Sequence, residues 1–440
     1  MIIHGMRANI FNKLNRLVPV KWRWIFQHTG FKRYFANTSW MFFGQIFSLF
    51  LSFFVGAWLA RYLGPNNYGN ISYAVAIVGV FGFIANLGID DLLRRDLIIH
   101  PDKHNDLLGT AFFLKLFGGF LAFILLVILS LLLPLTPTVR LIMVLYSTAF
   151  VFQAVNVIVF FFQAKVQAKN VVGAVLAATI FSSILKICLI VLGGGIIWLA
   201  VIYVLDFVWQ AIGLIIIYQH SGFKIAQWRF NQKLAKKMFS GSCFLMLAAA
   251  SSYIYLKIDQ IMIGIFMDIK SVGIYAAAVK FVEIWYFIPG IISTSLFPAI
   301  INAKKVNFNL YIERLRGLYF LMACIAVLIA IPTTIFAGPI IKLLFGQEYL
   351  AAAIILPIYI WSGLGLFVGW IINQHFLSEN HFKSIFCYNF FSMLFNILLN
   401  LIFIPRFGLT GAAWATFVSY SSGPVIVYLF RSFIFKKTYV

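Results

Sequence analysis

Long apolar stretches separated by short polar segments make up most of this chain. Runs of about 20 apolar residues, the length that crosses a bilayer as a helix, are bounded here by charged residues or by clusters of Gly, Pro and Asn. The pattern predicts an all-α polytopic membrane protein with twelve spans, at approximately 38–60, 70–89, 108–133, 139–163, 170–192, 196–219, 239–266, 272–300, 317–336, 351–376, 382–404 and 409–431.

The polar segments divide this pattern into five parts. A basic arm, 1–37, precedes the first span, and a second basic segment, 220–238, follows the sixth. We therefore expect an N-terminal six-helix bundle at 38–219, a cytoplasmic linker at 220–238, a C-terminal six-helix bundle at 239–431 and a short tail at 432–440.

A short internal repeat supports the division into two bundles. The heptapeptide YGNISYA (Tyr68 to Ala74) opens the second span, and VGIYAAA (Val272 to Ala278) opens the eighth, 204 residues later. Because each half holds an even number of spans, the two halves should share one orientation and be related by a pseudo-two-fold axis along the membrane normal.

Composition and charge agree with a membrane protein. The chain is 62% hydrophobic and 10% charged, with a mean hydropathy of +0.96, whereas about a quarter of the residues of soluble domains are charged. If the N-terminus is cytoplasmic, the inside segments hold 25 of the 34 Lys and Arg residues and the outside segments five. This positive-inside asymmetry explains the net charge of +22 without nucleic-acid binding. It predicts two cytoplasmic termini and, in a bacterial cell, the inner membrane.

The four cysteines point to neither a disulfide framework nor a metal site. Each lies alone within an apolar run, without CxxC or zinc-ligand spacing. We expect them to pack in the core, and we expect no metal; they are Cys188, Cys243, Cys324 and Cys387.

Several longer motifs resemble a known family. They are LARYLGPNNYGNISYAVAIVGVFGFIANLGID, KIDQIMIG, VGIYAAAVKFVEIWYFIP, SLFPAI and NILLNLIFIPRFGLTGAAWAT. In this order and spacing they resemble Wzx-type polysaccharide flippases of the multidrug/oligosaccharidyl-lipid/polysaccharide exporter superfamily, over residues 38–432. The glycines within them suit turns or close helix approach, and none is a catalytic signature.

The resemblance implies both an architecture and a cargo. It implies a V-shaped pair of six-helix bundles around a central cavity. The cargo would be a polyprenyl-diphosphate-linked oligosaccharide that moves from the inner to the outer leaflet for O-antigen or capsule synthesis. Transport in the family is thought to be driven by exchange of H+ or Na+, as in an antiporter, and contact with polysaccharide polymerase machinery is a further expectation. The absence of a GxxxxGK[ST] loop agrees with a transporter that has no built-in ATPase domain and no cofactor.

Charged residues within the spans are the main candidates for binding this cargo. A charged residue at the centre of a membrane helix costs roughly 2.5 to 3.5 kcal/mol on insertion scales, and a cationic cavity would offset the negative charge of a diphosphate. We expect four lysines to line the cavity, although long stems could let the last two reach the membrane interface instead; the lysines are Lys257, Lys280, Lys186 and Lys115.

Three acids lie in the same spans and could serve either ion coupling or ion pairing. Glu283 follows Lys280 by three residues and shares its helix face, so a local ion pair is one interpretation. Asp259 lies about 200° around the helix from Lys257, so these two cannot pair within their helix. Partly buried carboxylates can also exchange a proton during transport, which leaves both roles open for Asp259, Glu283 and Asp206.

Aromatic residues and prolines supply weaker candidates. Trp285, Tyr286 and Trp370 could stack on sugar rings, although packing or an interfacial belt is the alternative. Three prolines in span interiors should kink spans eight, nine and ten; they are Pro289, Pro332 and Pro357.

Other functions fit the residues less well. An integral-membrane polymerase or ligase needs a catalytic surface, but the longest outer loop, AGPIIKLLFGQEYL (Ala337 to Leu350), holds one acid and no nucleophile and base pair. A multidrug exporter of the same superfamily would favour an acidic cavity for cationic compounds. Peptidoglycan-precursor flippases, a third relative, typically have fourteen spans.

Overall fold

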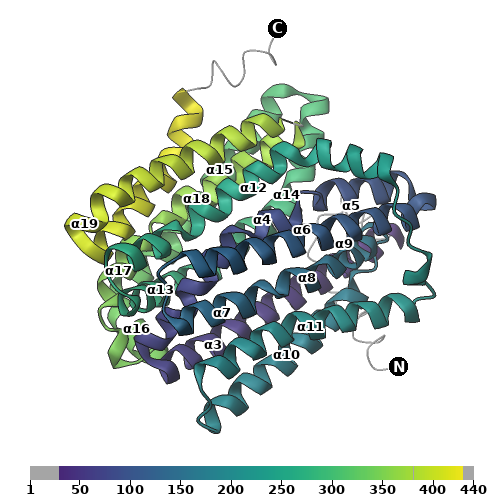
Figure 1. Ribbon diagram of the computed structural model, residues 1–440. Helices are drawn as coiled ribbons and strands as arrows, with labels where there is room; N and C mark the ends of the chain where they lie inside the picture. Colours follow the sequence, from purple (N-terminus) through teal and green to yellow (C-terminus); the bar gives the residue numbers. More distant parts are fainter. Residues whose placement is uncertain (1–28, 380, 430–440) are drawn as a thin grey trace, which may run out of the picture.

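The computed structural model describes residues 29–379 and 381–429, and within them every regular element is helical. Most of the expected arm 1–37 and the whole of the tail 432–440 therefore lie outside the described residues. Figure 1 shows the helices as one elongated bundle, with the first half of the chain in purple to teal and the second half in teal through green to yellow.

The first half of the chain, up to the linker, contains nine α-helices and two 3-10 turns within the described residues. They are α3 (Thr29–Val80), α4 (Gly82–Asn86), α5 (Asp90–Ile99), η2 (Pro101–Lys103), α6 (His104–Leu132), α7 (Pro137–Ser147), α8 (Ala149–Gln153), η3 (Ala154–Asn156), α9 (Val157–Ala164), α10 (Ala168–Val191) and α11 (Ile196–His220), where the three pieces α7, α8 and α9 make one membrane span.

The second half is built in the same way. Its elements are η4 (Ile225–Gln227), α12 (Gln232–Phe266), α13 (Ile269–Glu283), η5 (Ile284–Tyr286), α14 (Phe287–Val306), α15 (Phe308–Ile335), α16 (Ala337–Leu344), η6 (Gln347–Tyr349), α17 (Ala352–Tyr359), α18 (Ser362–Ser378) and α19 (Phe382–Leu429).

Two glycines divide long helices and explain why ten helical stretches contain twelve spans. Ten helical stretches of the described residues are long and apolar enough to cross a membrane. Two of them are double-length: α3 turns sharply at Gly64 and α19 at Gly408, both with positive φ (69° and 60°). Only glycine adopts such a conformation without strain, so each long stretch holds two spans. The all-α fold class with twelve spans is thus confirmed.

The internal repeat extends to the helix boundaries. α6 begins at His104 and α15 at Phe308, again 204 residues later, and the break after Val80 in the second span matches the 3-10 turn that begins at Ile284. The C-terminal half differs by an insertion after α15, which contains α16 and η6. The two bundles are therefore copies of one six-span unit, and the second carries an additional segment.

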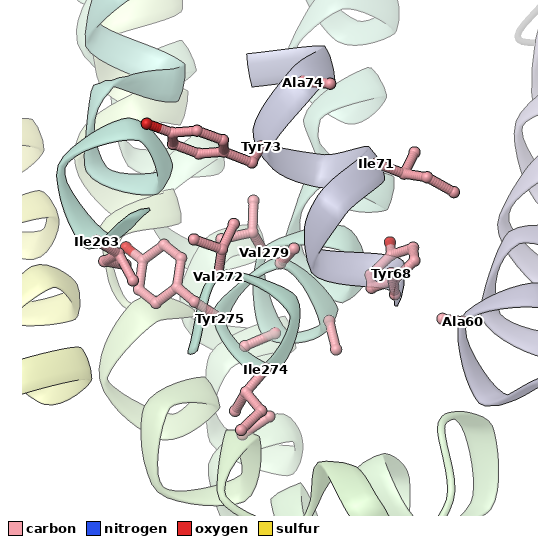
Figure 2. Close-up of a cluster of buried hydrophobic side chains, with 14 of the residues drawn as sticks. Ala60, Tyr68, Ile71, Tyr73, Ala74, Ile263, Val272, Ile274, Tyr275 and Val279 are labelled. Atoms are coloured by element: carbon pink, nitrogen blue, oxygen red, sulfur yellow. The ribbon is translucent and has the colours of Figure 1, made fainter. Parts of the chain in front are cut away.

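The two copies meet where the part of α3 that follows Gly64 crosses α13. A Cβ atom on Gly69 would overlap the carbonyl oxygen of Ile269, and a Cβ on Gly273 would overlap the carbonyl oxygen of Pro65. Gly69 and Gly273 are equivalent positions 204 residues apart, as are Pro65 and Ile269, so the repeat exchanges one contact for the other and the crossing lies on the pseudo-two-fold axis. Figure 2 shows the buried side chains around it, including Tyr68, Tyr73, Val272 and Tyr275.

Further contacts close the bundle at the end that carries α16. The Tyr349 hydroxyl donates a hydrogen bond to the Ala60 carbonyl oxygen (2.7 Å), and Gly346 packs on the side chain of Arg61. We call this the sealed end. The opposite, basic end carries α5, the linker and the connection from α14 to α15, and α5 and α16 lie far apart in Figure 1.

The outer surface of the bundle is apolar. Large side chains such as Phe117, Leu132, Phe320 and Leu328 are each at least 70% exposed. Soluble monomers rarely expose apolar surface on this scale, which suits contact with lipid. All four cysteines are also exposed, which corrects the expectation that they pack in the core: the helix faces that carry them point outward, and a lipid-facing position has the same apolar preference as a core position.

The linker is shorter than expected. Asn231 caps α12, because its side-chain oxygen accepts a hydrogen bond from the Leu234 amide, so the helix already begins at Gln232. The remaining connection packs on the first bundle: the Trp228 indole donates to the Tyr218 hydroxyl (3.0 Å), and the Asn231 amide donates to Thr110 Oγ1 (3.1 Å). The lysines of 232–238 therefore belong to the first turns of α12.

Candidate functional site

Two of the cavities that the described residues form lie between the sealed end and the basic end. The first has a volume of about 520 Å³ and is bounded by α3, α9, α10 and α13. Its polar lining consists of Gln45, Ser48, Ser52, Gln163, Lys280 and Glu283. We call it the lysine cavity. Its volume is within the range of about 300–1,000 Å³ that is typical of small-molecule sites.

Lys280 is the cation that faces the lysine cavity. It lies on α13, and its stem packs on Gly56 of α3. A Cβ atom added at Gly56 would lie 3.5 Å from Lys280 Cε. Among the described residues no carboxylate lies within 4.0 Å of its ammonium group. The other charges within electrostatic range are Glu283, Lys257 and Lys186. A diphosphate in this cavity would therefore meet a cation that has no ion-pair partner.

The other two lysines in this region are paired across helices. Lys257 on α12 forms an ion pair with Glu283 on α13 (2.6 Å), and Lys186 on α10 forms one with Asp206 on α11 (3.7 Å). Glu283 therefore pairs with Lys257 and not with its own helix neighbour Lys280. The two pairs cancel in charge, so the net positive charge next to the cavity comes from Lys280.

Lys115 is buried behind a carboxylate. Its side chain on α6 is 2% exposed and its ammonium lies 2.6 Å from Asp90, whose side chain is 35% exposed. Asp90 begins α5, where the helix dipole also favours a negative charge. Lys115 does not line either cavity. The sequence analysis did not single out Asp90, because it lies in the polar segment after span two.

Asp259 lines neither cavity. It is 2% exposed, and its two carboxylate oxygens accept hydrogen bonds from the Tyr275 hydroxyl (2.7 Å) and from the Gln260 amide (2.8 Å). No described cation lies within ion-pair distance. Asp259 thus links α12 to α13 near the crossing of the two bundles, as a buried carboxylate satisfied by neutral donors.

The second cavity, of about 450 Å³, lies between α5, α12, η5, α18 and α19. We call it the aromatic cavity, because Tyr253, Tyr255, Tyr286, Trp370 and Tyr388 line it. Asn373, Gln374 and Asn389 add amides, and Asp90 and Asp91 lie at its rim, near the basic end. Rings with polar edges and amides are the groups that bind sugars through stacking and hydroxyl hydrogen bonds.

The aromatic and proline candidates divide between cavity and packing. Tyr286 and Trp370 line the aromatic cavity, whereas Trp285 lines neither and packs against Phe281 (ring centroids 6.4 Å apart). The helix is interrupted beside Pro289, by η5, and after Pro357, where α17 ends at Tyr359. By contrast α15 continues through Pro332 to Ile335.

Several residues of the aromatic cavity were missed from the sequence. Asn373 and Asn389 lie in different spans, and single amides in apolar runs carry no motif. Tyr253 and Tyr255 lie just before Lys257 in span seven, and tyrosines beside a charge within a span are a signal that could have identified them.

The Lys115–Asp90 pair gives an asymmetric prediction. Asp90→Asn should lower the thermal midpoint of the purified protein, because it leaves a buried ammonium without its partner, which typically costs about 3–5 kcal/mol. Lys115→Met should lower it much less, because the remaining carboxylate reaches water. Thermal unfolding of both variants in detergent, followed by tryptophan fluorescence, compares them. Equal losses would contradict this burial asymmetry.

One protein family matches the sequence of most of the chain. The family described as "Polysaccharide biosynthesis protein" matches residues 34–304. A curated relative, the "Putative O-antigen transporter" of Shigella flexneri, is 23% identical over 341 residues, which cover 71% of this chain and 77% of that protein. The "Probable low-salt glycan biosynthesis flippase Agl15" of Haloferax volcanii is 26% identical over 195 residues, 44% of this chain and 41% of its own length.

Solved structures share the fold at low identity. An inward-facing multidrug resistance MATE family transporter of the MOP superfamily superposes with a TM-score of 0.70 and 13% identity, and covers 89% of this chain and 96% of its own. The lipid II flippase MurJ in an inward closed conformation has a TM-score of 0.67 and 18% identity, over 89% and 86% of the two chains. At these identities the likeness shows the two-bundle fold alone.

Proposed function

Because the chain belongs to the polysaccharide biosynthesis protein family, we propose that it is a flippase for lipid-linked glycans. In this proposal it moves a polyprenyl-diphosphate-linked oligosaccharide from the inner to the outer leaflet. Two relatives are named as an O-antigen transporter and as a glycan biosynthesis flippase, which supports a cargo for surface polysaccharide synthesis. The chain is a multi-pass membrane protein, and we place it in the cytoplasmic membrane with both termini inside.

The single observation that carries this proposal is Lys280 in the lysine cavity. An ammonium group inside the membrane without an ion-pair partner is unfavourable unless a ligand or water satisfies it. A diphosphate is a suitable ligand, because lysine binds phosphate as a point charge with three donors. The same net charge disfavours export of cationic drugs, which would meet repulsion there.

The position of the sealed end supports loading of the cargo from the basic end of the bundle. Both cavities lie on the basic-end side of the crossing at Gly69 and Gly273. With the basic end on the cytoplasmic side, the cavities face the leaflet in which lipid-linked repeat units are made. Release on the other side then requires the sealed end to open, which is alternating access between the two bundles.

The direct test is flipping in reconstituted vesicles. Purified full-length protein is placed in liposomes that contain a fluorescent polyprenyl diphosphate carrying a short oligosaccharide, and a membrane-impermeant reductant bleaches only the outer leaflet. We expect the protein to make all the probe accessible, while empty liposomes protect half of it. Protection of half the probe in protein-containing vesicles would overturn the proposal.

Asp259 is the residue that we propose couples transport to an ion gradient. It is buried between α12 and α13, so an ion reaches it only when the crossing of the bundles loosens, which is the motion that transport requires. We expect an imposed proton or sodium gradient to speed flipping by the wild type, and Asp259→Asn to lose that response while it retains flipping without a gradient.

The two gradients are imposed separately on the same vesicles, so the assay also identifies the ion. Glu313→Gln, at an exposed position on α15, is the matched control and should respond like the wild type. If Asp259→Asn keeps the full response, the carboxylate serves only to join the two helices.

A further inference from the structure

The aromatic cavity contrasts with the lysine cavity in charge. Its lining within the described chain includes no lysine or arginine, and the charged groups at its rim are the carboxylates of Asp90 and Asp91. The counter-charge of Asp90 is Lys115, which lies behind it and is 2% exposed against 35% for the carboxylate. Asp91 pairs with Arg94, which does not line the cavity. Within the described residues, carboxylates and neutral groups therefore line the cavity, and the cations that pair with these carboxylates lie outside its lining.

The neutral groups have free capacity for hydrogen bonding and for stacking. The amide groups of Asn373 and Asn389 face each other at 3.4 and 3.5 Å, which is long for a hydrogen bond, so hydroxyl groups could replace this contact at little cost. The ring edge of Trp370 packs on Gly290, where an added Cβ atom would lie 3.4 Å from Trp370 Cζ2. The residue is nevertheless 39% exposed. Part of the ring is therefore available for the C–H face of a sugar.

Residues of one short turn line both cavities. Ile284 lines the lysine cavity and Tyr286 lines the aromatic cavity, and both lie in the short 3-10 turn η5. At a rise of roughly 2 Å per residue, these two lining positions are about 4 Å apart along the chain axis. A diphosphate beside Lys280 and the sugars attached to it can thus be placed on the two sides of η5.

We propose that the aromatic cavity holds the glycan of the cargo and selects uncharged sugars, such as hexoses and N-acetylated hexosamines, over acidic ones such as uronic acids. This selectivity rests on the proposed flippase function. A uronic acid would bring its carboxylate next to Asp90 and Asp91, and like charges in contact cost several kcal/mol in an interface. Neutral sugars meet only rings, hydroxyls and amides.

The test uses two probes that differ by one carboxylate. Polyprenyl diphosphate carrying glucose and the same lipid carrying glucuronic acid are reconstituted separately with the full-length wild type, and the initial rates of flipping are compared. We expect the glucose lipid to flip at least about tenfold faster. Equal rates, or faster flipping of the glucuronic acid lipid, overturn the selectivity; flipping of neither overturns the proposed function itself and the selectivity with it.

Asp91→Asn tests the cause of the selectivity. It removes a rim carboxylate and leaves Arg94 without its partner, so the ratio of the two rates should fall severalfold toward one. Asp102→Asn changes an exposed acid on η2 that lines neither cavity and should leave the ratio at the wild-type value. A ratio that Asp91→Asn does not change would assign the selectivity to another part of the protein and overturn the role of this rim.

Discussion

Lys280→Ala is expected to reduce flipping of a polyprenyl-diphosphate-linked glycan by about tenfold to a hundredfold, the effect of losing one hydrogen bond to a charged group. The protein should remain folded in the membrane, because Lys280 has no described ion-pair partner that its removal would strand. Lys280→Arg should retain part of the activity, since it keeps the charge with a different geometry. The measurement is the initial flipping rate in vesicles.

The matched control lies on the same helix. Lys270→Ala removes an exposed lysine from the first turn of α13 and should leave the rate unchanged. Wild-type flipping by Lys280→Ala would show that this ammonium does not contact the cargo.

The neighbouring ion pair provides a sharper version of this test. Lys257→Met alone should slow flipping, because it frees Glu283 to pair with Lys280, three residues earlier on the same helix face. The double variant Lys257→Met with Glu283→Gln should recover much of the rate, because Lys280 is then unpaired again. Such recovery distinguishes an electrostatic role of Lys257 from a direct contact with cargo, which the second substitution could not restore.

Gly273→Val is expected to lower both the thermal stability and the flipping rate strongly. A Cβ at this position overlaps the carbonyl oxygen of Pro65, and the backbone cannot move aside as a side chain could, so the cost should exceed about 3 kcal/mol, the upper end for overpacked side chains. Gly317→Val on α15 is the control, because nothing lies within 4 Å of a Cβ there. Thermal unfolding in detergent and flipping in vesicles are the measurements.

The reciprocal position makes the prediction specific to the crossing. Gly69→Val should have the same effect, and the double variant should be little worse than either single one, because both open the same contact. Additive losses would instead show that the two glycines act at independent sites.

Much of the fold follows from the sequence, for a physical reason. A lipid environment requires apolar runs of nearly fixed length, so the ends of the apolar runs predict the span boundaries. The 204-residue repeat identifies the two copies. The linker boundary could not be found this way, because Lys233, Lys236 and Lys237 look like loop residues. Only the Asn231 cap shows that they are helical.

The candidate site was less accessible from the sequence. The lysines and acids stand out because they are rare in spans, but their partners depend on which helix faces meet. Glu283 has Lys280 within reach on its own helix and pairs with Lys257 on another. Asp90 lies outside the spans in sequence and reaches Lys115 in space. Helix periodicity predicts which residues share a face of one helix, but it does not predict which other helix packs against that face.

The glycine crossing also bears on the origin of the protein. Gly69 contacts the carbonyl oxygen of Ile269 in the first turn of α13, and Gly273 contacts the carbonyl oxygen of Pro65, the equivalent position in the other copy. An interface in which residue i contacts residue j and j contacts i is isologous, the form taken by a two-fold homodimer. A six-helix ancestor that paired through this single glycine would already have enclosed a space between its subunits. Fusing the two genes then allowed only one copy to acquire a lysine at 280, an asymmetry that no homodimer can have.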